Sequence, residues 1–221
     1  MQPSEHHFTV KRRARVYTLG NISEHIRYCC IACHGYGQLA GHFIRKFDQV
    51  AREDTLVIAP EGLSRFYWGG LAGEVKASWM TKEDRLNEIA DFSDYLSQLY
   101  NFYLPQLPSG TEIILFGFSQ GVATQLRWMT RAFPDFHHLI LWAGTIPEDI
   151  DYQPALGYFE GKPLHFVYGT EDQFLSPERL EAYRQEVAKA GLQFQERTFA
   201  GRHKVDRGAL LTLFREAIWK E

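Results

Sequence analysis

Short apolar or β-branched runs alternate along the chain with longer segments in which apolar residues recur at helical spacing. Several short runs are almost continuously apolar, which is typical of strands buried on both faces of a mostly parallel sheet. The longer segments have the periodicity of amphipathic helices. The alternation predicts a three-layer α/β/α sandwich with a mostly parallel central sheet and right-handed crossovers. No linker or internal repeat interrupts it, so residues 1–221 are expected to form a single domain.

The expected elements can be assigned from this pattern. The two N-terminal strands alternate with charged residues and are expected to form an antiparallel edge. The predicted strands are Ala14–Leu19, Ile26–Cys33, Thr55–Ala59, Glu112–Phe116, Leu139–Trp142, Leu164–Tyr168 and Phe194–Thr198. The predicted helices are Leu39–Arg52, Lys82–Tyr103, Gln120–Ala132, Pro177–Ala190 and Val205–Trp219.

The composition is that of a globular protein with a sizeable core, since 45% of the residues are hydrophobic and 23% are charged. A net charge of −3 gives no electrostatic reason to expect a nucleic acid partner. The one basic cluster is better explained by a solvated edge strand, and comprises Lys11, Arg12, Arg13 and Arg15. No signal peptide and no apolar run of membrane-spanning length is visible, so we expect a cytoplasmic protein without a transmembrane segment.

The three cysteines, Cys29, Cys30 and Cys33, lie together in one apolar run. Cys30 and Cys33 have the two-residue spacing of a metal-binding or redox pair. In a strand, however, positions three apart point to opposite faces, so one site cannot easily use both. We therefore expect reduced, buried core residues, as in a reducing compartment, and no metal site.

The segment Gly117–Gly121 reads Gly-Phe-Ser-Gln-Gly and joins a predicted strand directly to a predicted helix. This is the G-x-S-x-G pattern in the strand–turn–helix context of a nucleophile elbow. The glycines let the backbone turn tightly around a strained Ser119, and the helix N-terminus favours negative charge beside it. The alternative is a glycine-rich turn with a capping serine. The context favours Ser119 as a catalytic nucleophile.

A second glycine-rich loop, His34-Gly35-Tyr36-Gly37, follows another predicted strand. It resembles the loop that supplies α/β-hydrolases with an oxyanion donor, because glycines leave backbone amides free to point into the site. We expect the backbone amides of Tyr36 and Gln120 to form the oxyanion hole. His34 is interpreted as a residue that stabilises the loop, and a simple loop is the alternative.

In α/β-hydrolases the catalytic residues occur in the order serine, acid, histidine. That order excludes every histidine before Ser119 as the base. His137 and His138 directly precede a predicted strand and His165 lies inside one, so these are interpreted as structural. His203 remains, in a loop after the last predicted strand, where an open α/β sheet builds its site.

The acid is expected at Asp172, in the segment Gly169–Asp172 that follows a predicted strand. There it would fix the tautomer of the imidazole and stabilise its cation. Glu171 is the neighbouring rival, and Asp149 and Asp151 are weaker candidates after the preceding strand. The alternative for Asp172 is a turn or helix-capping aspartate.

With these residues the chain resembles, over nearly its whole length, the carboxylesterase, phospholipase and acyl-protein thioesterase group of α/β-hydrolases. The Gly-Phe-Ser-Gln-Gly elbow is typical of that group and more specific than the general motif. The resemblance implies a triad of Ser119, Asp172 and His203, and no cofactor. It is carried by His34–Gly37, Gly117–Gly121, Gly169–Asp172 and Gly201–His203.

The chain departs from the family pattern near the expected substrate groove. The family loop often reads His-Gly-Leu-Gly-Asp, whereas this chain has Tyr36 and Gln38. The family segment Ser-Trp-Phe-Asp corresponds to Ser78–Thr81, which reads Ser-Trp-Met-Thr. The resemblance therefore implies the class of reaction but not the acyl preference.

The stretch Glu61–Met80 gathers aromatic residues among glycines after a predicted strand. Such a stretch either lines an apolar acyl pocket or seals the edge of the core, and the sequence favours neither interpretation. The candidates for contact with substrate are Trp68, Trp79 and Met80.

These residues predict a serine hydrolase that cleaves acyl esters or thioesters, such as those of lysophospholipids, through an acyl-enzyme intermediate. The expected partner is thus a small-molecule acyl ester or thioester. A peptidase or lactone hydrolase on the same scaffold is an alternative, as is a non-catalytic ligand-binding protein of this fold. The complete set of three catalytic groups weighs against the non-catalytic alternative.

Overall fold

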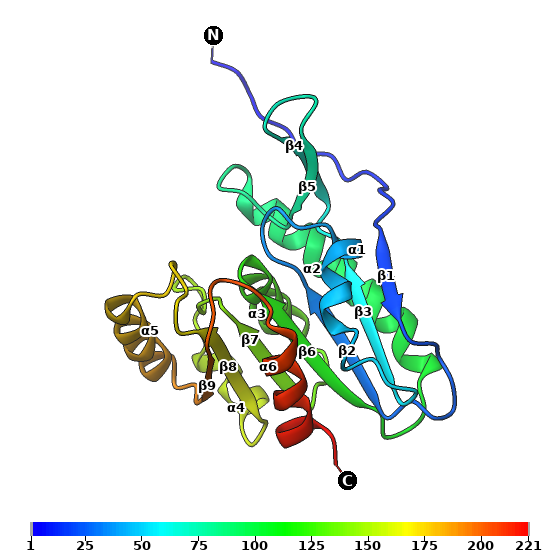
Figure 1. The fold of residues 1–221 in the computed structure, drawn as a ribbon. Helices are drawn as coiled ribbons and strands as arrows, with labels where there is room; N and C mark the ends of the chain where they lie inside the picture. Colours follow the sequence, from blue (N-terminus) through cyan, green and yellow to red (C-terminus); the bar gives the residue numbers. More distant parts are fainter. Residues whose placement is uncertain (1, 221) are drawn as a thin grey trace.

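The centre of the protein is a seven-stranded sheet with the order β1-β3-β2-β6-β7-β8-β9 (Figure 1). The computed structural model describes residues 2–220. Within this sheet β1 pairs antiparallel with β3 at one edge, and the other neighbours are parallel. The predicted mostly parallel sheet is confirmed. Its strands are β1 (Val16–Leu19), β2 (Tyr28–Cys33), β3 (Thr55–Pro60), β6 (Glu112–Phe118), β7 (His138–Trp142), β8 (Leu164–Gly169) and β9 (Gln195–Phe199).

Helices cover both faces of the sheet, which confirms the predicted sandwich. On one face Phe92 and Leu126, from α2 and α3, pack in the same apolar layer as Ile31 of β2. On the other face Phe43 of α1 and Leu213 of α6 pack against the opposite side of the strands. The helices are α1 (Ala40–Phe43), α2 (Arg85–Tyr103), α3 (Gln120–Ala132), α4 (Leu156–Phe159), α5 (Pro177–Ala190) and α6 (Arg207–Leu213).

The expectation that both N-terminal strands form an antiparallel edge is wrong for the second of them. β2 lies inside the sheet, parallel to β3 and β6, and all of its residues are buried. Arg27, the charged residue inside the predicted strand, comes before β2 begins. Of the two N-terminal strands, β1 alone lies at an edge of the sheet.

Two predicted helices are shorter than their periodicity indicated. The segment Leu39–Arg52 forms the single turn α1 and then a 3₁₀ helix, Ile44–Phe47. The C-terminal segment forms α6 and continues as a π-helix, Phe214–Ile218. The 3₁₀ and π-helical turns also direct one row of side chains toward the sheet. Apolar residues at helical spacing are therefore compatible with them as well as with an α-helix.

A hairpin that the sequence did not predict follows β3. It consists of β4 (Ser64–Trp68) and β5 (Glu74–Ser78), which pair antiparallel in a separate two-stranded sheet. Figure 1 shows it projecting beyond the carboxyl ends of the central strands. β4 has no apolar alternation, and in β5 only Val75 and Ala77 alternate with polar residues, a pattern too short to identify a strand in a sequence. The short helix α4 and the 3₁₀ turn Gln153–Ala155 were missed as well.

The three cysteines are buried free thiols in β2. Cys30 packs on one face of the sheet, whereas Cys29 and Cys33 pack on the other, as predicted from their spacing. Burial raises the pKa of the Cys29 thiol to about 12, because the apolar surroundings disfavour a thiolate. Within residues 2–220 no helix combines the length and apolarity needed to cross a membrane.

His138 and His165 lie in the core, in β7 and β8, with their rings stacked at 5.9 Å between centroids. Neither ring nitrogen of His165 has a hydrogen-bond partner among the residues that the structure describes. Burial lowers the pKa of His165 to about 4, since a charged imidazolium would lose its hydration there. Both histidines are structural, as their positions in the sequence indicated.

The free energy of unfolding is expected to decrease as the pH falls from 6.5 toward 4. In this range His165 takes up a proton in the unfolded chain, at its ordinary value of 6.5, but not in the folded chain. Between about pH 6.5 and 5, the uptake of this proton by the unfolded chain lowers the free energy of unfolding by an amount on the order of 1–2 kcal/mol. Urea unfolding at both pH values measures this loss, which His165→Leu should reduce and the exposed control His25→Gln should not. An unchanged pH dependence in His165→Leu would contradict the prediction.

Candidate active site

Ser119 stands at a sharp turn between β6 and α3, as the motif predicts. Its backbone has φ 52° and ψ −115°, a conformation that L-residues rarely adopt, and its amide donates to the Trp142 carbonyl at 2.9 Å. Glycines are required on both sides by close approach. A Cβ on Gly117 would lie 2.4 Å from the Gly121 carbonyl oxygen, and one on Gly121 would lie 2.1 Å from that of Cys33. This tight packing holds the turn in its strained form.

His203 connects Ser119 with Asp172. Its Nδ1 lies 2.7 Å from Oδ2 of Asp172, and its Nε2 lies 2.9 Å from Oγ of Ser119. A carboxylate only accepts hydrogen bonds, so Nδ1 donates to Asp172, which leaves Nε2 of the neutral ring to accept from the serine hydroxyl. The structure thus brings together the three side chains that the sequence singled out, from the loops after β6, β8 and β9.

Asp172 is held in one orientation. Its side chain is fully buried, and Oδ1 accepts from the backbone amide of Phe174 at 2.9 Å while Oδ2 faces His203. The rival Glu171 is exposed. Asp149 forms ion pairs with Arg85 and Arg127 instead. Of the acidic candidates considered, Asp172 has the contact with His203.

Two aromatic rings flank the imidazole of His203. Phe118 lies at 5.0 Å between ring centroids, and Phe174 meets the ring edge-on at 4.7 Å. Phe118 is buried, whereas Phe174 is half exposed. The rings restrict rotation of the imidazole, and aromatic faces interact favourably with a positive charge that forms between them.

The buried side chain of His34 stabilises the loop Gly35–Gln38 through two hydrogen bonds. Its side chain is fully buried, Nδ1 donates to the Gly35 carbonyl at 2.8 Å, and Nε2 accepts from the Gly62 amide at 3.0 Å. Burial lowers the pKa of His34 to about 4, so the imidazole stays neutral and keeps both bonds at neutral pH. This is the loop-stabilising position predicted for it.

The loop itself is fixed by further hydrogen bonds. The Gly35 amide donates to Oε1 of Gln38 at 2.9 Å, and the Gly37 amide donates to the Ala77 carbonyl of β5 at 2.9 Å. Gln38, which stands where the family resembled in sequence often has aspartate, therefore keeps an acceptor for the loop. The backbone of Tyr36 lies between these two anchored glycines.

The side chain of Gln120 makes a contact that the sequence did not reveal. Its Oε1 accepts from the Trp79 amide at 3.1 Å, and its Nε2 donates to the Met80 carbonyl at 2.8 Å. Gln120 is also the first residue of α3, directly after Ser119. One residue thus ties the helix N-terminus beside Ser119 to the segment that follows β5.

The three candidates for contact with substrate lie in different surroundings. Trp79 is buried and donates from Nε1 to the His34 carbonyl at 2.9 Å, beneath the loop. Trp68 is exposed on β4 and lies edge-on to Tyr36 at 6.3 Å. Met80 is half-buried beyond β5. A contact with substrate stays a prediction for all three.

An aromatic cluster links the glycine-rich loop to the hairpin. The ring of Tyr36, itself half exposed, stacks on Phe66 at 5.4 Å between centroids, and Trp68 completes the cluster. This aromatic cluster consists of Tyr36, Phe66 and Trp68. It forms an exposed apolar surface beside the loop Gly35–Gln38, which contains one of the expected oxyanion-hole amides. Tyr36, which stands where the family loop often has leucine, therefore packs against an aromatic residue of the hairpin.

Glu61 is a buried acid that the sequence analysis missed. Its Oε1 accepts from Arg15 and Arg65, each at 2.7 Å, and its Oε2 accepts from the Ala40 amide at 3.1 Å. Burial acts to raise the pKa of Glu61, but the hydrogen bonds from the two arginines outweigh it and hold the pKa below its ordinary value. Arg15 of the basic cluster thus neutralises a buried charge next to the start of α1.

No protein-family model and no curated protein sequence matches the chain. Solved structures do match in fold. Esterase PE8 matches with a TM-score of 0.66 and 19% identity, over 93% of this chain and 99% of that one. The acyl-protein thioesterase 2 of Zea mays matches with a TM-score of 0.68 and 14% identity, over 94% of this chain and 100% of that one. The carboxylesterase of Bacillus cereus matches with a TM-score of 0.63 and 14% identity, over 91% of this chain and 92% of that one.

The structural neighbours therefore belong to the carboxylesterase and acyl-protein thioesterase group of α/β-hydrolases, the group named from the motifs. At identities of 14–19% the likeness establishes the fold of this chain. The predicted α/β-hydrolase fold is confirmed.

Proposed function

We propose that the protein is a serine hydrolase that cleaves small acyl esters or thioesters. The observation that carries the proposal is the pair of hydrogen bonds from His203, at 2.9 Å to Ser119 and 2.7 Å to Asp172. The same three groups in the same chain order define the catalytic site of many α/β-hydrolases. We infer a single hydrolase domain that needs no cofactor for this reaction.

In the proposed reaction Oγ of Ser119 attacks the substrate carbonyl while Nε2 of His203 takes the hydroxyl proton. The buried Asp172 carboxylate stabilises the imidazolium that results. The tetrahedral intermediate collapses when His203 gives this proton to the leaving alcohol or thiol, which departs from the acyl-enzyme. Water then attacks the acyl-enzyme while Nε2 of His203 accepts a proton from it. As the bond from the acyl carbon to Oγ breaks, His203 returns this proton to Oγ, which releases the acid and restores Ser119.

The negative oxygen of the intermediate is proposed to bind the backbone amides of Tyr36 and Gln120. Support comes from the anchoring of both: the loop around Tyr36 is hydrogen-bonded to Gln38 and Ala77, and Gln120 is clamped to Trp79 and Met80. Donors that are fixed before the reaction need no reorganisation when charge develops, which is what makes such a site effective.

We propose that the acyl or alcohol group of the substrate lies along the cluster of Tyr36, Phe66 and Trp68. The cluster borders the loop of the proposed oxyanion hole, and its half-exposed rings offer an apolar surface. An ester with an apolar or aromatic substituent suits this surface better than a strongly polar one, because contact with it removes apolar area from water.

The 221-residue chain is expected to react covalently with a fluorophosphonate probe and to hydrolyse a short-chain p-nitrophenyl ester. The probe is attacked by an activated serine, so an α/β-hydrolase that only binds ligands would not be labelled. Mass spectrometry of the labelled peptide should locate the adduct on Ser119, and heat-denatured protein is the control. Absence of labelling, or an adduct on another residue, would refute the proposed function.

Peptidase and lactonase activity are tested on the same preparation. A panel of p-nitrophenyl esters, acyl thioesters, lactones and peptide amides distinguishes these reaction types. The proposal expects turnover of esters or thioesters to exceed that of the amides and lactones.

A further inference from the structure

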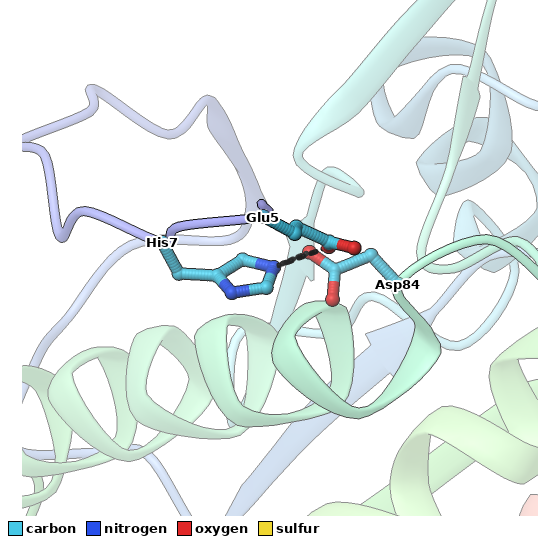
Figure 2. Close-up of side chains that lie close together, drawn as sticks. All are labelled: Glu5, His7 and Asp84. Carbon is cyan, nitrogen blue, oxygen red and sulfur yellow. Dashed lines mark ion pairs between the residues drawn. The ribbon is translucent and has the colours of Figure 1, made fainter. Parts of the chain in front are cut away.

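Three metal-ligating side chains converge away from the proposed active site, where the N-terminal segment passes the start of α2 (Figure 2). They are Glu5, His7 and Asp84, each of which offers one donor atom, and all three donors lie within 4.8 Å of one another. Nε2 of His7 lies 3.1 Å from Oε1 of Glu5 and 3.3 Å from Oδ2 of Asp84. The histidine nitrogen thus faces both carboxylates.

The two separations from the His7 nitrogen match those of donor atoms around a transition-metal ion. Zinc bonds to histidine nitrogen and carboxylate oxygen of about 2.0–2.2 Å, at tetrahedral to right angles, place neighbouring donors roughly 2.8–3.6 Å apart. Both distances from His7 fall inside this range. One imidazole and two carboxylates also form a donor set that suits zinc and its neighbours in the periodic table better than calcium or magnesium.

Asp84 is held with one oxygen free for a ligand. Its Oδ1 accepts from Nδ2 of Asn87 at 2.7 Å, which leaves Oδ2 directed at His7. The Asp84 carbonyl accepts from the amides of Asn87 and Glu88 and so begins α2. A metal ligand oriented by a second hydrogen bond of this kind is a common feature of metal sites. Asp84, the residue that precedes α2, therefore provides an oriented ligand that a metal ion can link to the N-terminal segment.

We propose that Glu5, His7 and Asp84 bind a divalent transition-metal ion of the zinc type. The three side chains are 44–79% exposed, so water can complete the coordination. A bound ion connects the N-terminal segment, in which the described residues 2–15 form no helix or strand, to the start of α2. The site is separate from Ser119 and does not depend on the proposed hydrolase activity.

Titration calorimetry of Zn²⁺ into the metal-free 221-residue chain tests the site. The expected result is saturable binding of about one ion per chain. His7→Gln and Asp84→Asn should each weaken it more than about tenfold, and Asn87→Ala on the order of tenfold through the orientation of Asp84. The matched control is His6→Gln, which removes a neighbouring imidazole of the same exposed segment and should leave the binding unchanged. Ser119→Ala should bind Zn²⁺ like the parent.

Hydrogen exchange provides a second readout that does not depend on heat of binding. Zn²⁺ should slow amide exchange at residues 5–8 in the parent and in His6→Gln, but not in His7→Gln. Equal thermal stability of the metal-free proteins checks that the variants fold. Absence of saturable binding, or binding that His7→Gln and Asp84→Asn leave intact, would overturn the proposal and make the cluster a hydrogen-bonded surface contact only.

Discussion

Ser119→Ala is expected to abolish hydrolysis of a p-nitrophenyl ester, with kcat/KM lowered by more than about 10³-fold. The alanine removes the only atom that forms the bond to the acyl group, whereas the rest of the turn stays in place. Because the hydroxyl is only half-buried and its hydrogen-bond partner is His203, the fold should tolerate the change. Steady-state kinetics of parent and variant measure the loss.

A matched serine variant separates loss of the nucleophile from general damage. Ser109→Ala alters an exposed serine in the turn before β6 and should retain parental activity. Urea unfolding should show that Ser119→Ala is folded, and it should no longer react with the fluorophosphonate. Residual activity within about tenfold of the parent would refute Ser119 as the nucleophile, since triad residues contribute far more.

The triad candidates could be predicted because each follows a strand in a short local motif. Ser119, Asp172 and His203 come after β6, β8 and β9, whose carboxyl ends lie at the same edge of a parallel sheet. Once the strands were recognised, their parallel order placed the three loops together. Their side-chain roles followed from the chain order of the residue types, and the structure supplies the contacts.

The supporting contacts could not be predicted because they join segments that are distant in sequence. Gln120 meets Trp79 and Met80 across about 40 residues, and Glu61 meets Arg15 across 46. The contact of Gln120 depends on the hairpin β4–β5, whose five-residue strands carry little periodic apolar signal. The contact of Glu61 depends on the antiparallel pairing of β1 with β3. A glutamine or a glutamate in a motif gives no sign of its partner until the path of the intervening chain is known.

The same limit explains why the sequence did not show whether the aromatic residues of the stretch 61–80 line an acyl pocket or cover the edge of the core. The stretch 61–80 contains both kinds of residue: Trp79 is buried under the glycine-rich loop, and Trp68 is exposed beside Tyr36. Composition alone could not separate them, because Trp68 ends β4 and Trp79 follows β5, and the sequence does not show which of these two positions the fold covers. Burial distinguishes them in the structure.

Asp172→Asn is expected to lower kcat on the order of 10⁴-fold while the protein stays folded. The asparagine carbonyl can keep the hydrogen bond from the Phe174 amide, which then turns the NH₂ group toward Nδ1 of His203. Nδ1 would have to accept this hydrogen bond, so the ring proton would move to Nε2. An imidazole protonated at Nε2 cannot take the proton of Ser119, which accounts for the size of the loss.

Glu171→Gln is the matched control, because it makes the same carboxylate-to-amide change one residue away on an exposed side chain. Its turnover should remain within about tenfold of the parent, since Glu171 lacks the buried contact through which a triad acid acts on the imidazole. Steady-state kinetics of both variants at one pH, with urea unfolding to verify the fold, measure the contrast. If Glu171→Gln lost activity and Asp172→Asn kept it, the acid would be Glu171, and the 2.7 Å contact between Asp172 and His203 would not be the catalytic one.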